Sequence, residues 1–92
     1  LRLHLDTGFA LLAGDSISSA IHKGGCMIQH FHLSEPHLSN FNLPVSEHEH
    51  AAKALKRVNY SGWCSIEMRE DTLWREACQV AVGFAVKMYS QV

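Results

Sequence analysis

The 92-residue chain has only two prolines, and it has neither a long apolar run nor an excess of charge of one sign. A bilayer-spanning helix needs about 20 consecutive apolar residues, so we expect no membrane role. The formal net charge is −1 and the charges are scattered, which disfavours binding to nucleic acids through their phosphates. The chain lacks a signal-like segment and opens with Leu1 in place of Met, so we expect a piece of a longer chain.

Cysteine is also scarce, and the three residues, Cys26, Cys64 and Cys78, are widely spaced. A disulfide framework uses an even number of cysteines. Their apolar surroundings predict reduced, buried thiols and therefore a cytoplasmic protein. The apolar content of 47% is typical of a globular chain, and 92 residues make one domain at most.

Three segments have the features of buried β-strands. Apolar and polar residues alternate through residues 1–6, and a Thr-Gly turn follows. Residues 26–35 form a second apolar run, which Pro36 bounds, and residues 62–69 form a third after a Tyr-Ser-Gly turn. Strands that alternate with helices predict βα units on a parallel sheet.

Three further segments predict amphipathic helices. The first follows Asp15 or Ser16 as its N-cap and ends at a Gly-Gly pair. The second begins with a capping box of Ser46 and Glu49, and the third runs through residues 72–89. The predicted inner faces of the three helices are Ile17, Ala20 and Ile21, then Ala51, Leu55 and Val58, then Leu73, Ala77, Val80, Phe84 and Met88.

Together the segments make three βα units, at about 1–25, 26–58 and 59–92, within one domain at 1–92. Each is close to the ~30 residues of one crossover unit. The sequence therefore predicts an α/β fold with parallel strands.

Each predicted strand carries a side chain that can bind a metal at or near its carboxyl end. These are Asp6, His32 and Glu67, which lie 26 and 35 residues apart, about one unit each time. Active sites of parallel α/β folds are built at this end of the strands. Two carboxylates and an imidazole suit Mn²⁺, Mg²⁺, Co²⁺ or Zn²⁺. His30 shares a strand face with His32 and could orient a ligand.

Each of these side chains also has a structural interpretation. Asp6 could cap the turn that follows it. His30 and His32 could be hydrogen-bonded interior residues. Glu67 is harder to explain structurally, because an unpaired carboxylate after an apolar strand is costly.

Two other groups of residues predict structure without chemistry. His48 and His50 alternate with glutamates near a helix start, so we expect them to face solvent or cap the helix, with no metal role. Trp63 and Trp74 are expected to anchor the packing.

The motifs DTG, HFHLSEP and YSGWCSIEM resemble the C-terminal part of the xylose-isomerase-like TIM barrels. This superfamily includes sugar isomerases, sugar 3-epimerases and sugar phosphate isomerase/epimerase-like proteins. The resemblance covers residues 3–70 and implies strands six to eight of a barrel. Asp6, His32 and Glu67 then match three of the four metal ligands of the family. The fourth, a glutamate, comes from an earlier strand that this chain lacks.

The resemblance implies a divalent-metal-dependent enzyme of carbohydrate metabolism that acts on a sugar or sugar phosphate. In such isomerases and epimerases the metal promotes proton transfer through an ene-diolate, with Glu67 as ligand and general base. His30 would support the ligands. Glu35, in the loop over the site, would contact a substrate hydroxyl or hold His32. A hydride shift, as in xylose isomerases, remains open.

The chain departs from the sugar epimerases at two positions. Phe9 stands where they often have a substrate-contacting histidine, and Leu38 stands where they often have an arginine. The substrate specificity of the family is therefore not carried over to this chain.

Three of eight barrel units leave open sheet edges, so we expect a homo-oligomer that completes the sheet by self-association. Without the fourth ligand, the isolated chain is expected to be inactive. The alternative is a self-associating structural fragment without catalysis. Metal-dependent cleavage of DNA at abasic sites is disfavoured, because no basic face is evident.

Overall fold

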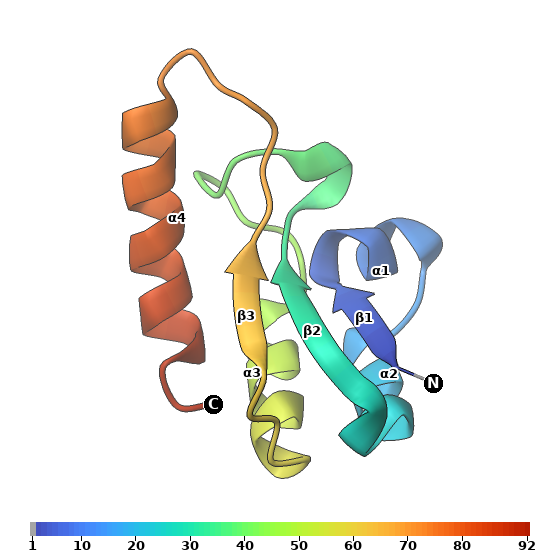
Figure 1. Ribbon diagram of the computed structural model, residues 1–92. Coiled ribbons are helices and arrows are strands. Elements are labelled where there is room, and N and C mark those ends of the chain that lie inside the picture. Colours follow the sequence, from blue (N-terminus) through green and yellow to red (C-terminus); the bar gives the residue numbers. More distant parts are fainter. Residues whose placement is uncertain (1) are drawn as a thin grey trace.

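In the computed structural model, which describes residues 2–92, three parallel strands form one sheet in the order β1-β2-β3 (Figure 1). The predicted α/β class with parallel strands is therefore confirmed. Leu1, which begins the predicted first strand and domain, lies outside the described residues. The strands are β1 (Leu3–Asp6), β2 (Ile28–Leu33) and β3 (Trp63–Ile66); the α-helices are α1 (Thr7–Ala13), α2 (Ile17–Gly24), α3 (His48–Arg57) and α4 (Trp74–Tyr89); two 3₁₀ turns are η1 (Gly25–Met27) and η2 (Pro36–Leu38).

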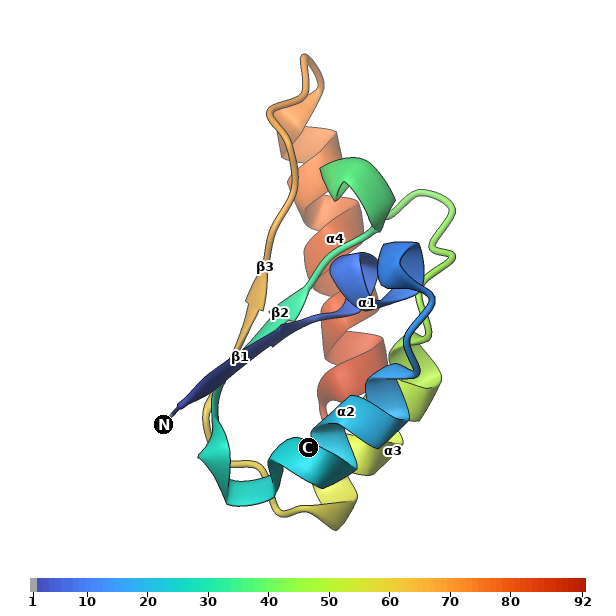
Figure 2. The ribbon, with the colours of Figure 1, turned by 90° about the vertical axis from the view of Figure 1, so that its right-hand side faces the viewer.

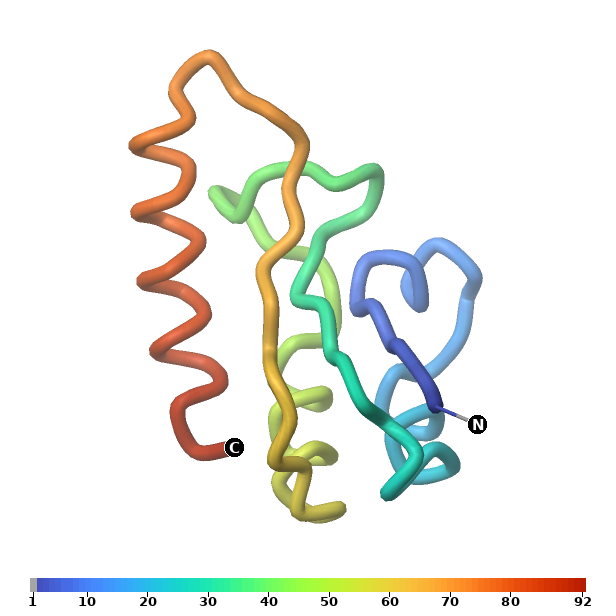
Figure 3. Tube along the Cα trace, viewed as in Figure 1, coloured from blue at the N-terminus to red at the C-terminus, as the bar shows by residue number. Residues whose placement is uncertain are grey.

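The α-helices lie on one face of the sheet and leave the other face uncovered (Figure 2). The Cα trace shows that the chain leaves all three strands at the same edge (Figure 3). Side chains of β2 alternate between the two faces. Phe31 and Leu33 point to the helices and are buried, whereas His30 and His32 point to the uncovered face and are only half-buried.

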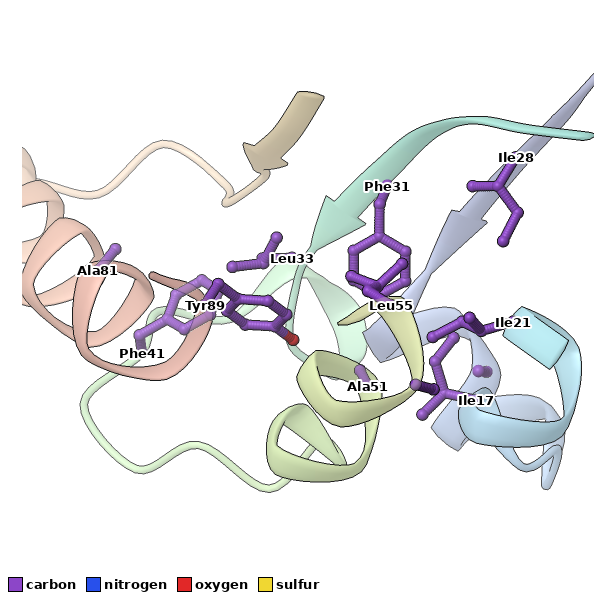
Figure 4. Packing of buried hydrophobic residues seen from close by; sticks show 12 residues of the cluster. Ile17, Ile21, Ile28, Phe31, Leu33, Phe41, Ala51, Leu55, Ala81 and Tyr89 are labelled. Atoms are coloured by element: carbon purple, nitrogen blue, oxygen red, sulfur yellow. The ribbon is translucent and has the colours of Figure 1, made fainter. Parts of the chain in front are cut away.

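The core lies between the sheet and the helices. Phe31 of β2 packs against Tyr89 at the end of α4, with ring centroids 6.1 Å apart, and Phe41 packs against Phe84 of the same helix at 5.7 Å. Figure 4 shows the buried residues of this cluster, which also includes Leu55 of α3. Ile17 and Ile21 of α2 complete this layer, as their spacing predicts. The apolar core therefore packs against one face of the sheet only.

The structure corrects several element boundaries near the site. The Thr-Gly turn after the first strand is the start of an unpredicted helix, α1, whose N-cap is Asp6. The second strand begins later than predicted, because residues 25–27 form η1. The predicted capping box is absent: the N-cap of α3 is Glu47, and Ser46 Oγ donates to the carbonyl oxygen of Ser34. In contrast, Ser16 caps α2 as predicted.

Helix α4 packs through a narrower face than its sequence predicts. Ala77, Ala81 and Tyr89 are buried, but Leu73 and Val80 are 64% and 42% exposed. The reason is that α4 covers the edge strand β3 and has no further strand beside it (Figure 1).

The cysteines and the predicted anchors also differ from expectation. Cys26 and Cys78 are exposed and Cys64 is half-buried, and all three thiols are free. Trp63 and Trp74 are 78% and 57% exposed, so neither anchors the packing of this chain. None of the helices within residues 2–92 has the length and apolar character that crossing a membrane requires.

Candidate metal centre

The strand register brings Asp6, His32 and Glu67 together at the carboxyl edge of the sheet. Asp6 pairs with His32 across β1 and β2. Glu67 directly follows β3, and its backbone N–H donates to the carbonyl oxygen of Leu33 at 3.0 Å. One ligand atom from each of the three side chains lies within 4.8 Å of the others. We call these three residues the metal group.

The donor atoms of the metal group fit a divalent ion. His32 Nδ1 lies 2.6 Å from Glu67 Oε1, and the two side chains are 25% and 42% exposed. Zn²⁺, Mg²⁺ and Mn²⁺ bind nitrogen and oxygen at about 2.0–2.3 Å, so ligand atoms around one ion lie roughly 3–4 Å apart. The three ligand atoms of the metal group lie within 4.8 Å of one another, which is close to this range. The mixed oxygen and nitrogen set matches these ions.

Asp6 is held in place by two hydrogen bonds to one carboxylate oxygen. Its Oδ1 accepts from Ser34 Oγ at 2.5 Å and from the backbone N–H of Phe9 at 2.8 Å. The second bond caps α1, so Asp6 has the structural role that its sequence context suggests. Both bonds use Oδ1, which leaves Oδ2 available to a metal.

A pair of hydroxyl side chains ties the ends of β1 and β2 together beneath Asp6. Thr7 Oγ1 donates to the carbonyl oxygen of Ser34 at 2.8 Å and accepts from the backbone N–H of Ser34 at 2.9 Å. A Cβ at Gly8 would lie 2.6 Å from the backbone of Glu35, so only glycine allows this approach. The sequence pattern did not identify Thr7 and Ser34, although Thr7 directly follows the first predicted strand and Ser34 lies near the carboxyl end of the second.

Glu35 does not contribute to the metal group. Its side chain is 2% exposed, and its Oε2 lies 2.5 Å from His48 Nε2. Its Oε1 accepts from the backbone N–H groups of Val45 and Ser46 at 2.5 and 3.2 Å. The expectation that Glu35 holds His32 or contacts a substrate hydroxyl is therefore corrected, because its carboxylate closes the loop between β2 and α3.

His48 is buried, contrary to the expectation that it faces solvent. It is 2% exposed, and its Nδ1 lies 2.7 Å from the hydroxyl of Tyr89. Burial lowers the pKa of His48 below its ordinary value of 6.5, although the hydrogen bond and the charge of Glu35 oppose this effect. Burial likewise raises the pKa of Tyr89 well above its ordinary value of 10.0.

One neutral tautomer of His48 satisfies both of its contacts when Glu35 is ionised. The neutral His48 donates from Nε2 to Glu35 and accepts at Nδ1 from the Tyr89 hydroxyl. We call Glu35, His48 and Tyr89 the buried network. The spacing of His48, Ala51 and Leu55 on one helix face is the sequence signal that could have placed this histidine inside. His50, in contrast, is exposed as expected.

Three histidine rings line the uncovered face of the sheet next to the metal group. The centroids of His4 and His30 are 5.3 Å apart, and those of His30 and His32 are 5.6 Å apart. His30 therefore lies against His32, where it can restrict the orientation of that ring. Trp63 pairs with His30 in the sheet register, at the far end of β3 from Glu67.

Comparisons with known proteins support the fold. No protein-family model and no curated protein sequence matches the chain. Among solved structures, D-psicose 3-epimerase from Clostridium cellulolyticum H10, determined with D-tagatose, matches with a TM-score of 0.83 at 18% identity over 96% of this chain. An L-ribulose 3-epimerase matches with a TM-score of 0.78 at 18% identity over 97% of the chain. D-Allulose 3-epimerase from Methylomonas sp., in complex with D-allulose, matches with a TM-score of 0.77 at 19% identity over 96%.

The chain spans 38%, 36% and 37% of the length of these three epimerases, respectively. At 18–19% identity the likeness shows the fold, and it does not extend to activity. The chain thus has the fold of part of these TIM-barrel epimerases, which agrees with the barrel fold that the resemblance of its strand motifs implies.

Proposed function

We propose that the chain is the metal-binding part of a divalent-metal-dependent sugar or sugar phosphate isomerase or epimerase. The observation that carries this proposal is the metal group at the carboxyl edge of the sheet. The epimerases of the same partial fold include structures with D-tagatose and with D-allulose. The missing ligand and strands would come from the rest of the barrel or from another subunit.

In this proposal Asp6, His32 and Glu67 hold the ion, which supplies Lewis-acid polarisation of sugar oxygens when bound. Glu67 has the exposure that a general base requires, because 42% of its side chain remains open to a substrate. Before the ion binds, the 2.6 Å contact between its Oε1 and His32 Nδ1 keeps these two ligand side chains together. At the opposite side of the metal group, hydrogen bonds from Ser34 Oγ and from the backbone N–H of Phe9 hold Asp6 in place.

Water proton relaxation tests this function, because bound Mn²⁺ enhances relaxation and a sugar that displaces water from the ion reduces it. We expect enhancement with the parent chain and a decrease on adding D-allulose. The Glu67→Gln variant should lose the enhancement, since it removes an anionic ligand, while the exposed control Glu70→Gln should retain it. Enhancement that is equal in all three proteins, or indifferent to the sugar, would contradict the proposal.

A second candidate is a self-associating fragment without catalysis. It is favoured by Trp63, Trp74 and Val86, which are 78%, 57% and 62% exposed, and by the unpaired outer edge of β3. Sedimentation equilibrium should then give a mass that rises with concentration. Trp63→Lys should weaken the association and Leu43→Lys, in an exposed loop position, should not. A monomer at high micromolar concentration would exclude this candidate.

A further inference from the structure

A small cavity adjoins the metal group at the carboxyl edge of the sheet. It has a volume of about 190 Å³, and residues of α1, of η2 and of the segments at the carboxyl ends of β1 and β2 line it. Asp6 belongs both to its lining and to the metal group. Its volume equals that of about six water molecules at roughly 30 Å³ each. It therefore has room for one end of a ligand whose other end is held by the metal group.

The outer wall of this cavity is apolar and open to solvent. Phe9 and Leu12 from α1 are 70% and 52% exposed, and Leu38 from η2 is 39% exposed. A single exposed apolar residue needs no explanation. Here three of them, from two separate elements, surround one cavity beside a polar group.

Leu38 is held at the cavity in an unusual backbone conformation. Its φ is 56°, and that of the preceding His37 is 59°, a left-handed region that bulky residues rarely adopt. Two backbone hydrogen bonds hold it there: Leu38 N–H donates to Glu35 at 2.9 Å, and Arg69 N–H donates to Leu38 at 2.8 Å. The backbone of this loop therefore holds Leu38 at the apolar wall of the cavity.

Most polar side chains of the cavity already have partners. Ser34 Oγ bonds to Asp6 and Gly8, and the Glu35 carboxylate belongs to the buried network. Apart from Asp6 Oδ2, which is left to the metal, the exposed His37 is the one side chain of this lining that can meet a ligand hydroxyl. A hydroxyl placed against this wall would lose bonds to water, whereas a methyl group would gain from leaving water.

We propose that the cavity receives the methyl end of a deoxy sugar whose oxygenated end lies at the metal group. The inference rests on the proposed function, since the metal group anchors the sugar. It narrows the substrate class to sugars in which a methyl group replaces the terminal hydroxymethyl group.

The test compares the affinities of 6-deoxy-D-fructose and D-fructose for the parent chain with Mg²⁺, by saturation-transfer-difference NMR. We expect the deoxy sugar to bind roughly tenfold more tightly, the scale on which an apolar pocket separates analogues that differ by one group. Leu38→Asn should remove the preference, and asparagine tolerates the left-handed backbone. The control Leu43→Asn, at an 87% exposed position outside the cavity, should retain it.

The outcomes separate this inference from the proposed function. Equal affinities, or tighter binding of D-fructose, together with binding that Glu67→Gln abolishes, would overturn the deoxy-sugar inference and leave the metal function standing. Absence of sugar binding, together with Mg²⁺ binding that is indifferent to Glu67→Gln, would overturn both. A preference that survives in Leu38→Asn would also contradict the inference, because the apolar wall would not be its source.

Discussion

Replacing His48 with alanine is expected to lower the free energy of unfolding by about 3–5 kcal/mol. The substitution removes the donor to Glu35, whose carboxylate is 2% exposed and would stay behind in the core. Small domains are stable by only about 5–15 kcal/mol, so the variant should be largely unfolded under mild denaturing conditions. Guanidinium denaturation followed by circular dichroism measures the loss.

Milder variants separate the buried network from a general loss of packing. Tyr89→Phe leaves Nδ1 of His48 without its donor and should cost about 1–3 kcal/mol while the chain still folds. Tyr60→Phe is the matched control: its hydroxyl donates to the carbonyl oxygen of Trp63 near the surface, and its loss should cost about 1 kcal/mol or less. Equal losses in the two variants, or a His48→Ala loss below about 1 kcal/mol, would show that the network contributes little.

The pH dependence of stability should report on the same network. The pKa of His48 is lowered in the folded chain, so below its ordinary value of 6.5 the unfolded chain binds a proton that the folded chain excludes. Stability should therefore fall as the pH falls from about 6.5 toward the folded pKa, and level off below it. A His48→Gln variant should lose this part of the dependence.

Saturating Mn²⁺ is expected to stabilise the chain, because the ion would bind the folded state through one ligand from each strand segment. At a free concentration of a hundred times its Kd, a ligand that binds only the folded state adds about 2.7 kcal/mol to the free energy of unfolding. Asp6, His32 and Glu67 are far apart in the sequence and converge only in the folded sheet. Denaturation with Mn²⁺ and with a chelator measures the difference.

Two variants test whether this stabilisation comes from an ion at the metal group. Glu67→Gln should abolish it, and Glu70→Gln, at an exposed position outside the metal group, should not change it. Equal stabilisation of both variants would place the ion elsewhere on this histidine-containing surface. The comparison is direct because both substitutions remove one negative charge.

The parallel sheet and the convergence of the three residues of the metal group follow from local sequence patterns. Alternation in the strands and apolar stripes in the helices identify the βα units, and parallel strands present their carboxyl ends at one edge. Asp6, His32 and Glu67 each lie at such an end, so their convergence depends only on strand order and register.

Other features depend on contacts that no local pattern reveals. The sequence predicts a turn where α1 begins, because an Asp-Thr-Gly sequence serves equally well as a turn and as the start of a capped helix. The buried network joins a loop to two helices, and His48 lies 13 positions from Glu35 and 41 positions from Tyr89 in the sequence. The exposure of Trp63 reflects the sheet face that no helix covers, and the sequence does not show which face of a strand is left uncovered.

The most direct test of the metal centre is a calorimetric titration of the purified chain with Mn²⁺, in parallel with Glu67→Gln. The geometry of Asp6, His32 and Glu67 predicts binding at one site in the parent chain and loss of that binding in the variant. Absence of binding, or binding that Glu67→Gln leaves unchanged, would contradict the metal centre and leave only the likeness in fold to part of a TIM barrel.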